Sequence, residues 1–408
     1  MKEFVRRFPR EIWALVGVQT ITSAGFSLAL PFLSLYLSRE RGVPMSLVGT
    51  LMLFSAFASA LGQFLGGEGS DRFGRKPVLI WSFALRILAF SATAWLMGSG
   101  GPVWAIALLY LAIRVTGGLA QPPISALFAD LVQAARVEGY GLLRVGANVG
   151  WALGPALGGY LATFFPYAAL FLFGAGVTFV ALILTSQAVR EPFARTQEKQ
   201  KSILALRDRR LWAILGLSLP VFLVAGQLVS TLSVFLVGRL GLSEARFGGL
   251  LTLNGLLVVV AQYPLARLVQ GWPARRGLAL GALLYALGYL SFGWIRAYPL
   301  MILAIAVVTL GEMIFTPVAM AVVANLASKD QRGRYMGLFG LIQSFGWSGG
   351  AFLGGVLLDY APNPPVLWGS LTSLGFLAFF LFLGAGKLFH DAFQGKPAGA
   401  LDKKEGRA

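Results

Sequence analysis

The stretch Gly67-Glu68-Gly69-Ser70-Asp71-Arg72-Phe73-Gly74-Arg75-Lys76 stands between two long apolar runs, Leu47 to Leu65 and Pro77 to Met97. Each run has close to the roughly 20 apolar residues that a helix needs to cross the hydrocarbon core of a membrane. Because glycine has no Cβ and tolerates turn geometry, the glycines of this stretch allow two helices to meet closely. The pattern therefore predicts a charged hairpin between two membrane helices, with its acidic and basic side chains in water at one membrane face.

A second signature is a series of regularly spaced glycines inside a later apolar run. Residues four apart share one face of a helix, so the series presents a strip of bare backbone that suits close helix contact in lipid. The strip consists of Gly146, Gly150, Gly154, Pro155, Gly158 and Gly159. A single Gly-x-x-x-Gly would indicate ordinary packing, whereas three such steps with a Gly-Pro dipeptide and a final Gly-Gly are hard to obtain by chance.

The two stretches resemble the cytoplasmic loop motif and the antiporter motif of the major facilitator superfamily, in the order and spacing of that family. The second motif is similar to that of the proton-coupled drug efflux branch, and Arg114-Val115-Thr116-Gly117-Gly118 is similar to the family's fourth-helix motif. The resemblance covers nearly the whole chain. It implies twelve transmembrane helices in two pseudo-symmetric six-helix bundles, with substrate bound between the bundles and access alternating as they rock.

Composition agrees with an all-α membrane protein. The 408 residues are 57% hydrophobic and only 12% charged, whereas charged residues make up about 25% of typical soluble domains. Hydropathy predicts about twelve spans. They are 13–37, 46–66, 77–98, 102–129, 139–163, 167–188, 211–237, 246–267, 275–295, 299–326, 335–358 and 365–386. A charged linker, 190–210, would separate an N-terminal bundle, 1–189, from a C-terminal bundle, 211–387, and a tail, 388–408, would follow.

Internal repeats and charge support this organisation. A shift of 199 places Gly42 and Gly49 on Gly241 and Gly248, so the two halves are one six-helix unit used twice. Most of the 34 Lys and Arg residues lie in segments that are cytoplasmic if the N-terminus is inside. We therefore expect a multi-pass protein of the inner membrane with both termini in the cytoplasm.

Several classes of protein are excluded or disfavoured. The net charge of +17 is scattered over inner loops and forms no folded basic face, which favours contact with anionic lipids over binding of nucleic acid. The chain has no cysteine, and its one histidine, His390, lies in the predicted tail. The sequence contains no nucleotide-binding P-loop, so a pump driven directly by ATP is unsupported. We expect a monomer without a metal site, a cofactor or enzymatic activity.

The family resemblance implies a conformational switch at the charged hairpin. The switch residues are Gly67, Asp71, Arg72, Gly74, Arg75, Lys76, Asp130 and Arg144. Asp71 would cap a helix of the other half, because an anion suits a helix N-terminus, and Arg72 and Arg75 would exchange partners with Asp130. The alternative is that these charges only anchor a loop at the headgroups.

Charged residues inside spans predict function, since each costs a few kcal/mol at the bilayer centre unless it is paired or hydrated. Of the 17 acidic residues only Glu312 lies deep in a span, where a carboxyl group can load and release a proton as water access changes. Arg114 is similar to the family arginine proposed to assist proton transfer. Arg86 is expected on a peripheral helix, where it would snorkel or pair locally. The alternative for Glu312 is a permanent bond that fixes packing.

Candidates for the substrate cavity are polar and aromatic residues within spans: Gln19, Ser23, Phe26, Asn148, Gln227, Ser230, Asn254, Thr316 and Gln343. Each of them could equally be a helix contact. Few fixed charges argue against highly charged substrates. Together with aromatic residues that suit flat apolar or cationic molecules, the resemblance to the drug efflux branch implies proton-coupled efflux of hydrophobic or cationic drug-like compounds. A facilitator or symporter of a sugar, metabolite or lysolipid is the alternative, and a non-transporting receptor or scaffold is a remote one.

Overall fold

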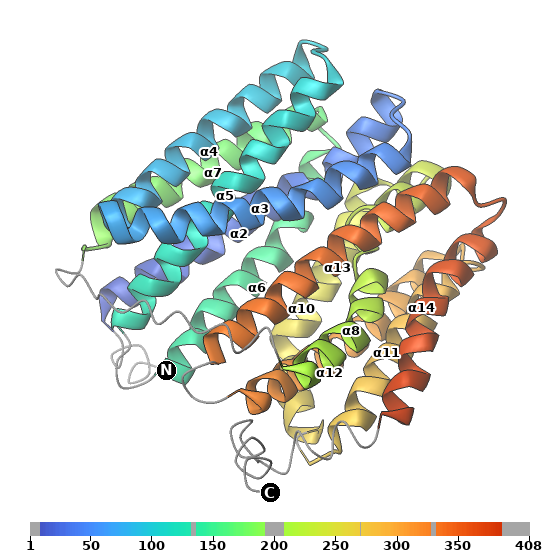
Figure 1. Cartoon of the computed structure of the whole chain (residues 1–408). Coiled ribbons are helices and arrows are strands. Elements are labelled where there is room, and N and C mark those ends of the chain that lie inside the picture. The colour runs from blue at the N-terminus through green and yellow to red at the C-terminus, as the bar shows by residue number, and fades with distance from the viewer. Residues whose placement is uncertain (1–8, 132–135, 192–207, 270, 328–331, 386–408) are drawn as a thin grey trace, which may run out of the picture. The chain divides into compact units, whose positions relative to one another are not determined.

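The computed structural model describes residues 9–131, 136–191, 208–269, 271–327 and 332–385 (Figure 1). Within these ranges every regular element is a helix, which confirms the prediction of an all-α protein. Nine described helical segments are long and apolar enough to cross a membrane. Three further helical regions, in α6, α8 to η3, and α11, coincide with the remaining predicted spans. The chain is a multi-pass membrane protein.

The chain divides into two compact units, residues 1–197 with 228–259, and residues 198–227 with 260–408. The first unit contains α2 (Arg10–Leu35), η1 (Tyr36–Glu40), α3 (Met45–Phe73), α4 (Arg75–Gly98), α5 (Val103–Leu131), α6 (Arg136–Leu161), α7 (Tyr167–Ala188), α9 (Thr231–Ser233), η3 (Val234–Arg239) and most of α10 (Glu244–Val269). The second unit contains α8 (Arg209–Ala225), the end of α10, α11 (Ala274–Ser291), α12 (Tyr298–Leu326), α13 (Arg332–Tyr360) and α14 (Pro364–Gly384). The predicted boundary between halves at 190–210 stays a prediction.

Corresponding helices pair in the same way in the two halves of the sequence. In the first unit α2 packs against α6 and α7, and α4 packs against α5 and α7. In the second unit α8 packs against α13 and α14, and α11 packs against α12 and α14. The helix order makes these pairs equivalent, so packing repeats along with the sequence.

The turns that end the first helix of each half repeat in atomic detail. Each ends in a π-helical segment, η1 or η3, which is followed by a glycine with positive φ, Gly42 at 63° and Gly241 at 70°. An equivalent backbone hydrogen bond closes each turn: Val43 N donates to Leu37 O at 2.9 Å, and Leu242 N donates to Leu236 O at 3.0 Å. All three positions differ by the shift that the sequence repeat predicts.

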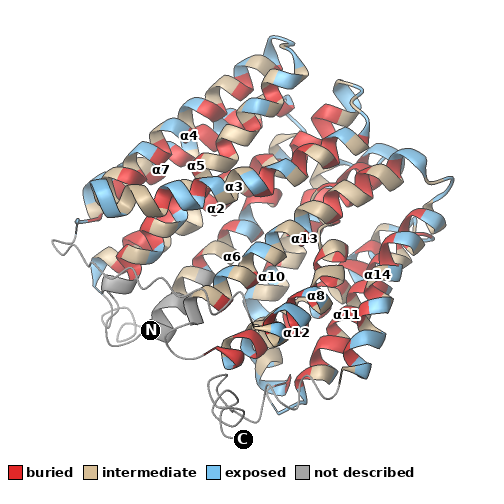
Figure 2. Ribbon diagram, viewed as in Figure 1, coloured by how far each residue is buried: buried red, intermediate tan, exposed pale blue. Residues whose placement is uncertain are grey.

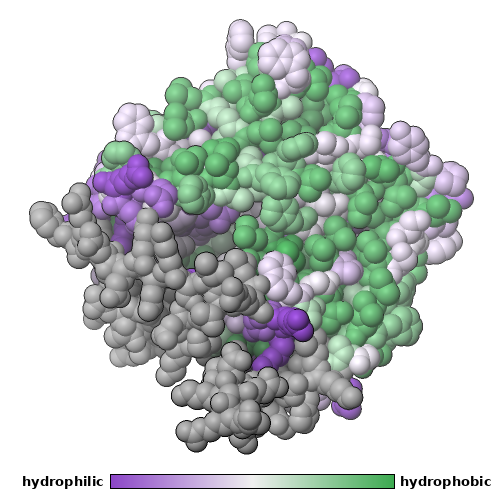
Figure 3. Space-filling view, viewed as in Figure 1, coloured by the Kyte–Doolittle hydropathy of each residue, from purple (hydrophilic) through white to green (hydrophobic). Residues whose placement is uncertain are grey.

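Burial separates the two faces of the helices (Figure 2). In the first unit, buried apolar side chains of α2, α4, α5 and α7 form one cluster that includes Leu15, Phe83 and Phe128. Large apolar side chains such as Phe54, Phe57, Leu61 and Phe64 of α3 are exposed instead. The visible surface of the helices is accordingly largely apolar (Figure 3). Apolar faces of this extent suit lipid contact.

Two expectations about helix limits were wrong. The predicted spans 46–66 and 77–98 stop short of the observed helices, because α3 continues to Phe73 and α4 begins at Arg75, so Gly74 alone separates them. The predicted span 211–237 is not one continuous helix, because α8 ends at Ala225 and residues 226–230 form a turn. Gly226 packs against the backbone of Trp347 at this point, which leaves no room for a side chain.

Candidate functional site

Gly74 forms the junction between α3 and α4. Its φ of 95° and ψ of 161° lie in a region that residues with a Cβ rarely adopt. The junction is capped by Glu191, which follows α7: its carboxylate accepts hydrogen bonds from the backbone N–H groups of Arg75 at 2.8 Å and Lys76 at 2.6 Å. A carboxylate at a helix N-terminus satisfies free N–H groups and favours the helix dipole.

The basic side chains of the junction reach two neighbouring helices. Arg75 Nη1 donates to the backbone oxygen of Ala126 on α5 at 3.2 Å, and Lys76 Nζ donates to that of Ser186 on α7 at 2.7 Å. The junction therefore ties α3 and α4 to α5 and α7. The predicted partners Asp130 and Arg144 have side chains outside the described residues.

The other switch candidates lie on the last turns of α3. Asp71 is exposed, and Arg72 lies 3.9 Å from Glu68 one turn earlier. Gly67 has open space where a Cβ would project. The acid that caps a helix here is Glu191, which sequence reasoning placed in the linker and did not consider. Its signal was only that it follows a predicted span directly.

The glycine strip of α6 lies against α2. A Cβ on Gly150 would meet the backbone oxygen of Thr20, and one on Gly154 would meet the Ser27 hydroxyl and the backbone of Ala24. Gly146 and Gly158 face the same helix. Ser27 Oγ also donates to the backbone oxygen of Gly150 at 3.2 Å. The backbones of α6 and α2 are therefore in direct contact at these glycines, with no space for a side chain between them.

The remaining residues of the strip face α10. A Cβ on Gly159 would lie 2.6 Å from the backbone oxygen of Glu244 and 3.1 Å from Cα of Gly248. A Cβ on Gly248 would lie 2.5 Å from the backbone oxygen of Pro155. Helix α6 therefore contacts α2 on one face and α10 on another within the first unit.

Two arginines and two aromatic rings meet in the first unit; we call this set, Phe26, Arg86, Arg114 and Trp151, the Phe26 cluster. Cζ of Arg114 lies 5.0 Å from the centroid of the Phe26 ring, and Cζ of Arg86 lies 5.6 Å from it. Trp151 meets the same ring edge to face at 6.1 Å. Arg114 Nε also donates to the backbone oxygen of Ser55 at 3.5 Å.

The expectation for Arg86 was wrong. Its side chain is only 6% exposed and projects from α4 toward Gly117 of α5, so it does not snorkel from a peripheral face. Hydropathy alone does not show which face of α4 packs against α5. A Cβ on Gly117 would lie 3.8 Å from Cζ of Arg86, an ordinary contact.

The polar candidates of the first unit differ in burial. Gln19 and Ser23 lie one turn apart on α2, with Gln19 Nε2 donating to Ser23 Oγ at 3.4 Å. Ser230 is buried, while Asn148 and Asn254 are half-buried. Sequence reasoning placed Phe26 and Arg114 in separate groups, and the structure brings them together.

In the second unit, Glu312 is half-buried on α12 beside an aromatic column. Helix α12 packs against α11, which carries Tyr285 and Tyr289. The two tyrosine rings are stacked with centroids 6.4 Å apart, and Tyr289 stacks on Trp368 of α14 at 5.9 Å. The column is buried, whereas Glu312 is only half-buried.

The other candidates of the second unit are Gln227, Thr316 and Gln343. Gln227 is fully buried, and its Nε2 donates to the backbone oxygens of Leu223 and Gly350, both at 2.8 Å. This amide therefore holds α8 against α13. Thr316 and Gln343 are half-buried.

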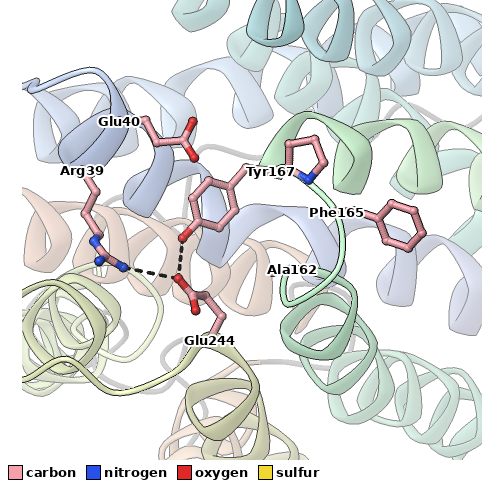
Figure 4. A pocket seen from close by; sticks show the side chains of 7 residues that line it. Arg39, Glu40, Ala162, Phe165, Tyr167 and Glu244 are labelled. Atoms are coloured by element: carbon pink, nitrogen blue, oxygen red, sulfur yellow. Dashed lines mark hydrogen bonds and ion pairs between the residues drawn. The ribbon is translucent and has the colours of Figure 1, made fainter.

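A pocket of about 380 Å³ opens where η1, α7 and α10 begin or end (Figure 4). Glu244 is at its centre: Arg39 Nη1 lies 3.3 Å from its carboxylate, and the Tyr167 hydroxyl donates to the same oxygen at 2.8 Å. Glu40 and Phe165 also line the pocket. Sequence reasoning missed this cluster because its three members are far apart in the chain and each lies at the end of a span.

Comparisons with known proteins agree with this architecture. A model of the Major Facilitator Superfamily matches residues 15–249 and 228–404. The chain is 27% identical to the multidrug resistance protein MdtH of Proteus mirabilis (strain HI4320), covering 87% of this chain and 90% of that protein. It is 23% identical to an uncharacterized MFS-type transporter, YqjV, of Bacillus subtilis (strain 168), covering 90% and 92%.

A solved structure gives the same result for the fold. The nucleoside transporter NupG superposes with a TM-score of 0.79 at 14% identity, covering 92% of this chain and all of that chain. At this identity the likeness concerns the fold alone. Since the family model matches nearly the whole sequence, the chain belongs to the major facilitator superfamily of membrane transporters.

Proposed function

We propose that the chain is a secondary transporter of the inner membrane that works by alternating access and exports hydrophobic, drug-like compounds in exchange for protons. Family membership supports transport, and the likeness to MdtH, a multidrug resistance protein, supports efflux. Both termini would be cytoplasmic, and the halves 1–189 and 211–387 would rock about the linker 190–210.

The observation that supports proton coupling is the position of Glu312. Every other described acidic residue lies at or near the end of a helix, whereas Glu312 is in the middle of α12. It is half-buried on a helix that packs against α11, whose Tyr285 and Tyr289 form a stacked column with Trp368. A half-buried carboxyl group in the middle of a spanning helix has restricted access to water, which suits proton exchange with one side of the membrane at a time.

The test is uptake of a lipophilic fluorescent cation into inverted proteoliposomes, with and without an inward-acid pH gradient. Gradient-driven accumulation that Glu312→Gln abolishes is the expected result. Glu11→Gln is the matched control, since Glu11 is a half-buried acid in the first turn of α2. Accumulation that survives Glu312→Gln moves the proton site elsewhere, and transport without any gradient effect favours a facilitator.

A role for Asp71 in switching remains part of this proposal. Its exposed carboxylate at the end of α3 is available to cap a helix of the other half in one conformation. The Arg75 side chain already reaches the backbone oxygen of Ala126 on α5, one helical turn before Asp130, which supports the proposed exchange of partners.

A further inference from the structure

The Phe26 cluster concentrates positive charge in the interior of the first unit. Arg86 is buried, and its Nε is shielded from solvent without a hydrogen-bond partner among the described residues. A second arginine, Arg114, lies over the same Phe26 ring, with its Cζ 5.0 Å from the ring centroid against 5.6 Å for Arg86. Two like charges thus share one aromatic ring.

No described carboxylate neutralises this pair. The acidic side chains described in the first unit lie at or near helix ends: Glu11, Glu40, Glu68, Asp71, Glu191 and Glu244. Asp130 and Glu138, whose side chains are not described, are distant along their own helices. At 1.5 Å per residue, Asp130 is roughly 24 Å from Arg114, and Glu138 is roughly 20 Å from Trp151.

Arg86 Cζ also lies 5.6 Å from the centroid of the Phe90 ring. Two ring faces offset only a part of the cost of burying a guanidinium group beside a second one. A carboxylate or sulfonate beside both arginines would offset the rest, because the guanidinium fork matches planar oxyanions. The cluster is accessible to a ligand, since Phe26 and Arg114 are half-buried and Trp151 is 36% exposed. The two aromatic side chains add an apolar surface next to the charge.

We propose that the Phe26 cluster binds the anionic group of an amphipathic aromatic compound, with Arg86 and Arg114 holding the oxyanion and Phe26 and Trp151 contacting the apolar part. This inference rests on the proposed transport function, because it names the substrate class. It departs from the hydrophobic or cationic compounds that the sequence predicts, because Arg86 was expected on a peripheral helix and not in the interior.

The test compares two probes that share a pyrene group and a tether, pyrenebutyrate and pyrenebutyl-trimethylammonium. Binding to the full chain in nanodiscs of zwitterionic lipid is measured by fluorescence anisotropy, with empty nanodiscs subtracted. We expect the anionic probe to bind about tenfold more tightly than the cationic one. Arg86→Gln and Arg114→Gln should each remove about that factor for the anion and leave the cation unchanged.

Control variants separate binding from folding. Arg267→Gln is matched, since Arg267 lies 4.9 Å from the Tyr263 ring but on an exposed face of α10, and it should change neither probe. Arg114→Lys should keep part of the anion preference, whereas a merely structural role would lower binding of both probes together. If Arg86→Gln does not fold, Arg114→Gln decides, because that residue is only half-buried.

Equal binding of the two probes by the native chain overturns the inference, as does anion binding that survives both glutamine variants. These failures differ from failure of the proposed function. Gradient-driven, Glu312-dependent uptake of the cationic probe without anion preference would keep the function and discard the inference. Anion binding that depends on both arginines, without gradient-driven uptake of either probe, would keep the inference about the Phe26 cluster and discard the proposed proton-coupled function.

Discussion

Gly74 adopts a backbone conformation that residues with a side chain avoid, whereas Gly67, seven residues earlier, is helical. We expect Gly74→Ala to destabilise the protein by about 1–3 kcal/mol, because φ is 95° and ψ is 161° and because a Cβ would lie 3.0 Å from Glu191 Oε1. Gly67→Ala should be neutral or stabilising by up to about 1 kcal/mol, since Gly67 is helical with open space around it. Thermal unfolding of the two variants in one detergent measures the difference. Equal midpoints would contradict the strain at Gly74.

Glu191 should be worth about 1 kcal/mol of stability as a cap of α4. Its carboxylate accepts from two backbone N–H groups, so Glu191→Ala leaves both unsatisfied, while Glu191→Gln retains one acceptor and should fall between. The unfolding midpoint should be highest for the native protein, lower for Glu191→Gln and lowest for Glu191→Ala. Glu11→Ala is the control, because this acid of the first turn of α2 makes no cap hydrogen bond, and a similar loss there would discount the cap.

At this scale the sequence predicts which residues are special but not their partners. Gly74 follows from its place in a glycine-punctuated charged stretch. Glu191 is 116 residues from Arg75 and lies where the linker was expected, so local pattern cannot pair them. The prediction for Arg86 was wrong for a related reason. Which face of α4 is buried depends on packing with α5, and one sequence does not reveal that packing.

Helix contact through α6 depends on its missing side chains. We expect Gly154→Ala to destabilise the protein by about 1–3 kcal/mol, the usual cost of overpacking, because its Cβ would meet backbone atoms of Ala24 and Leu28 as well as Ser27. Gly176→Ala on α7 is the matched control, since nothing lies within 4 Å of its Cβ position. Unfolding midpoints and transport rates of both variants test this. Full stability of Gly154→Ala would show that α2 and α6 separate easily.

Helix existence was predictable from apolar runs, whereas helix limits were not. Hydropathy ends a span at the first charged residues, but backbone hydrogen bonding continues α3 into the charged stretch as far as Phe73. The break after Ala225 has the opposite origin. There the run remains apolar, and close packing of Gly226 on Trp347 accompanies the interruption.

For the whole molecule, the sequence repeat predicts the shared helix pairing and the two π-helical turns. It does not predict the Glu244 cluster, because η1, α7 and α10 come from distant parts of the chain. In the predicted division of the chain, Arg39 and Tyr167 belong to the first half and Glu244 to the second. In the structure all three residues lie in one compact unit. Under the proposed alternating access between the predicted halves, the contact is expected to break when its end of the protein opens.

Locking this cluster should therefore stop transport. The chain has no cysteine, so a variant with Arg39→Cys and Glu244→Cys presents two thiols at partly exposed positions whose native side chains lie 3.3 Å apart. A short bis-methanethiosulfonate linker should abolish turnover in proteoliposomes, and reductant, which cleaves the linker, should restore the rate of the same sample. Substrate binding should persist in the linked protein, because the linker restrains movement and leaves the Phe26 cluster untouched. Linked protein that transports at the unlinked rate would mean that η1, α7 and α10 stay together throughout the cycle, and the opening would then have to occur elsewhere in the molecule.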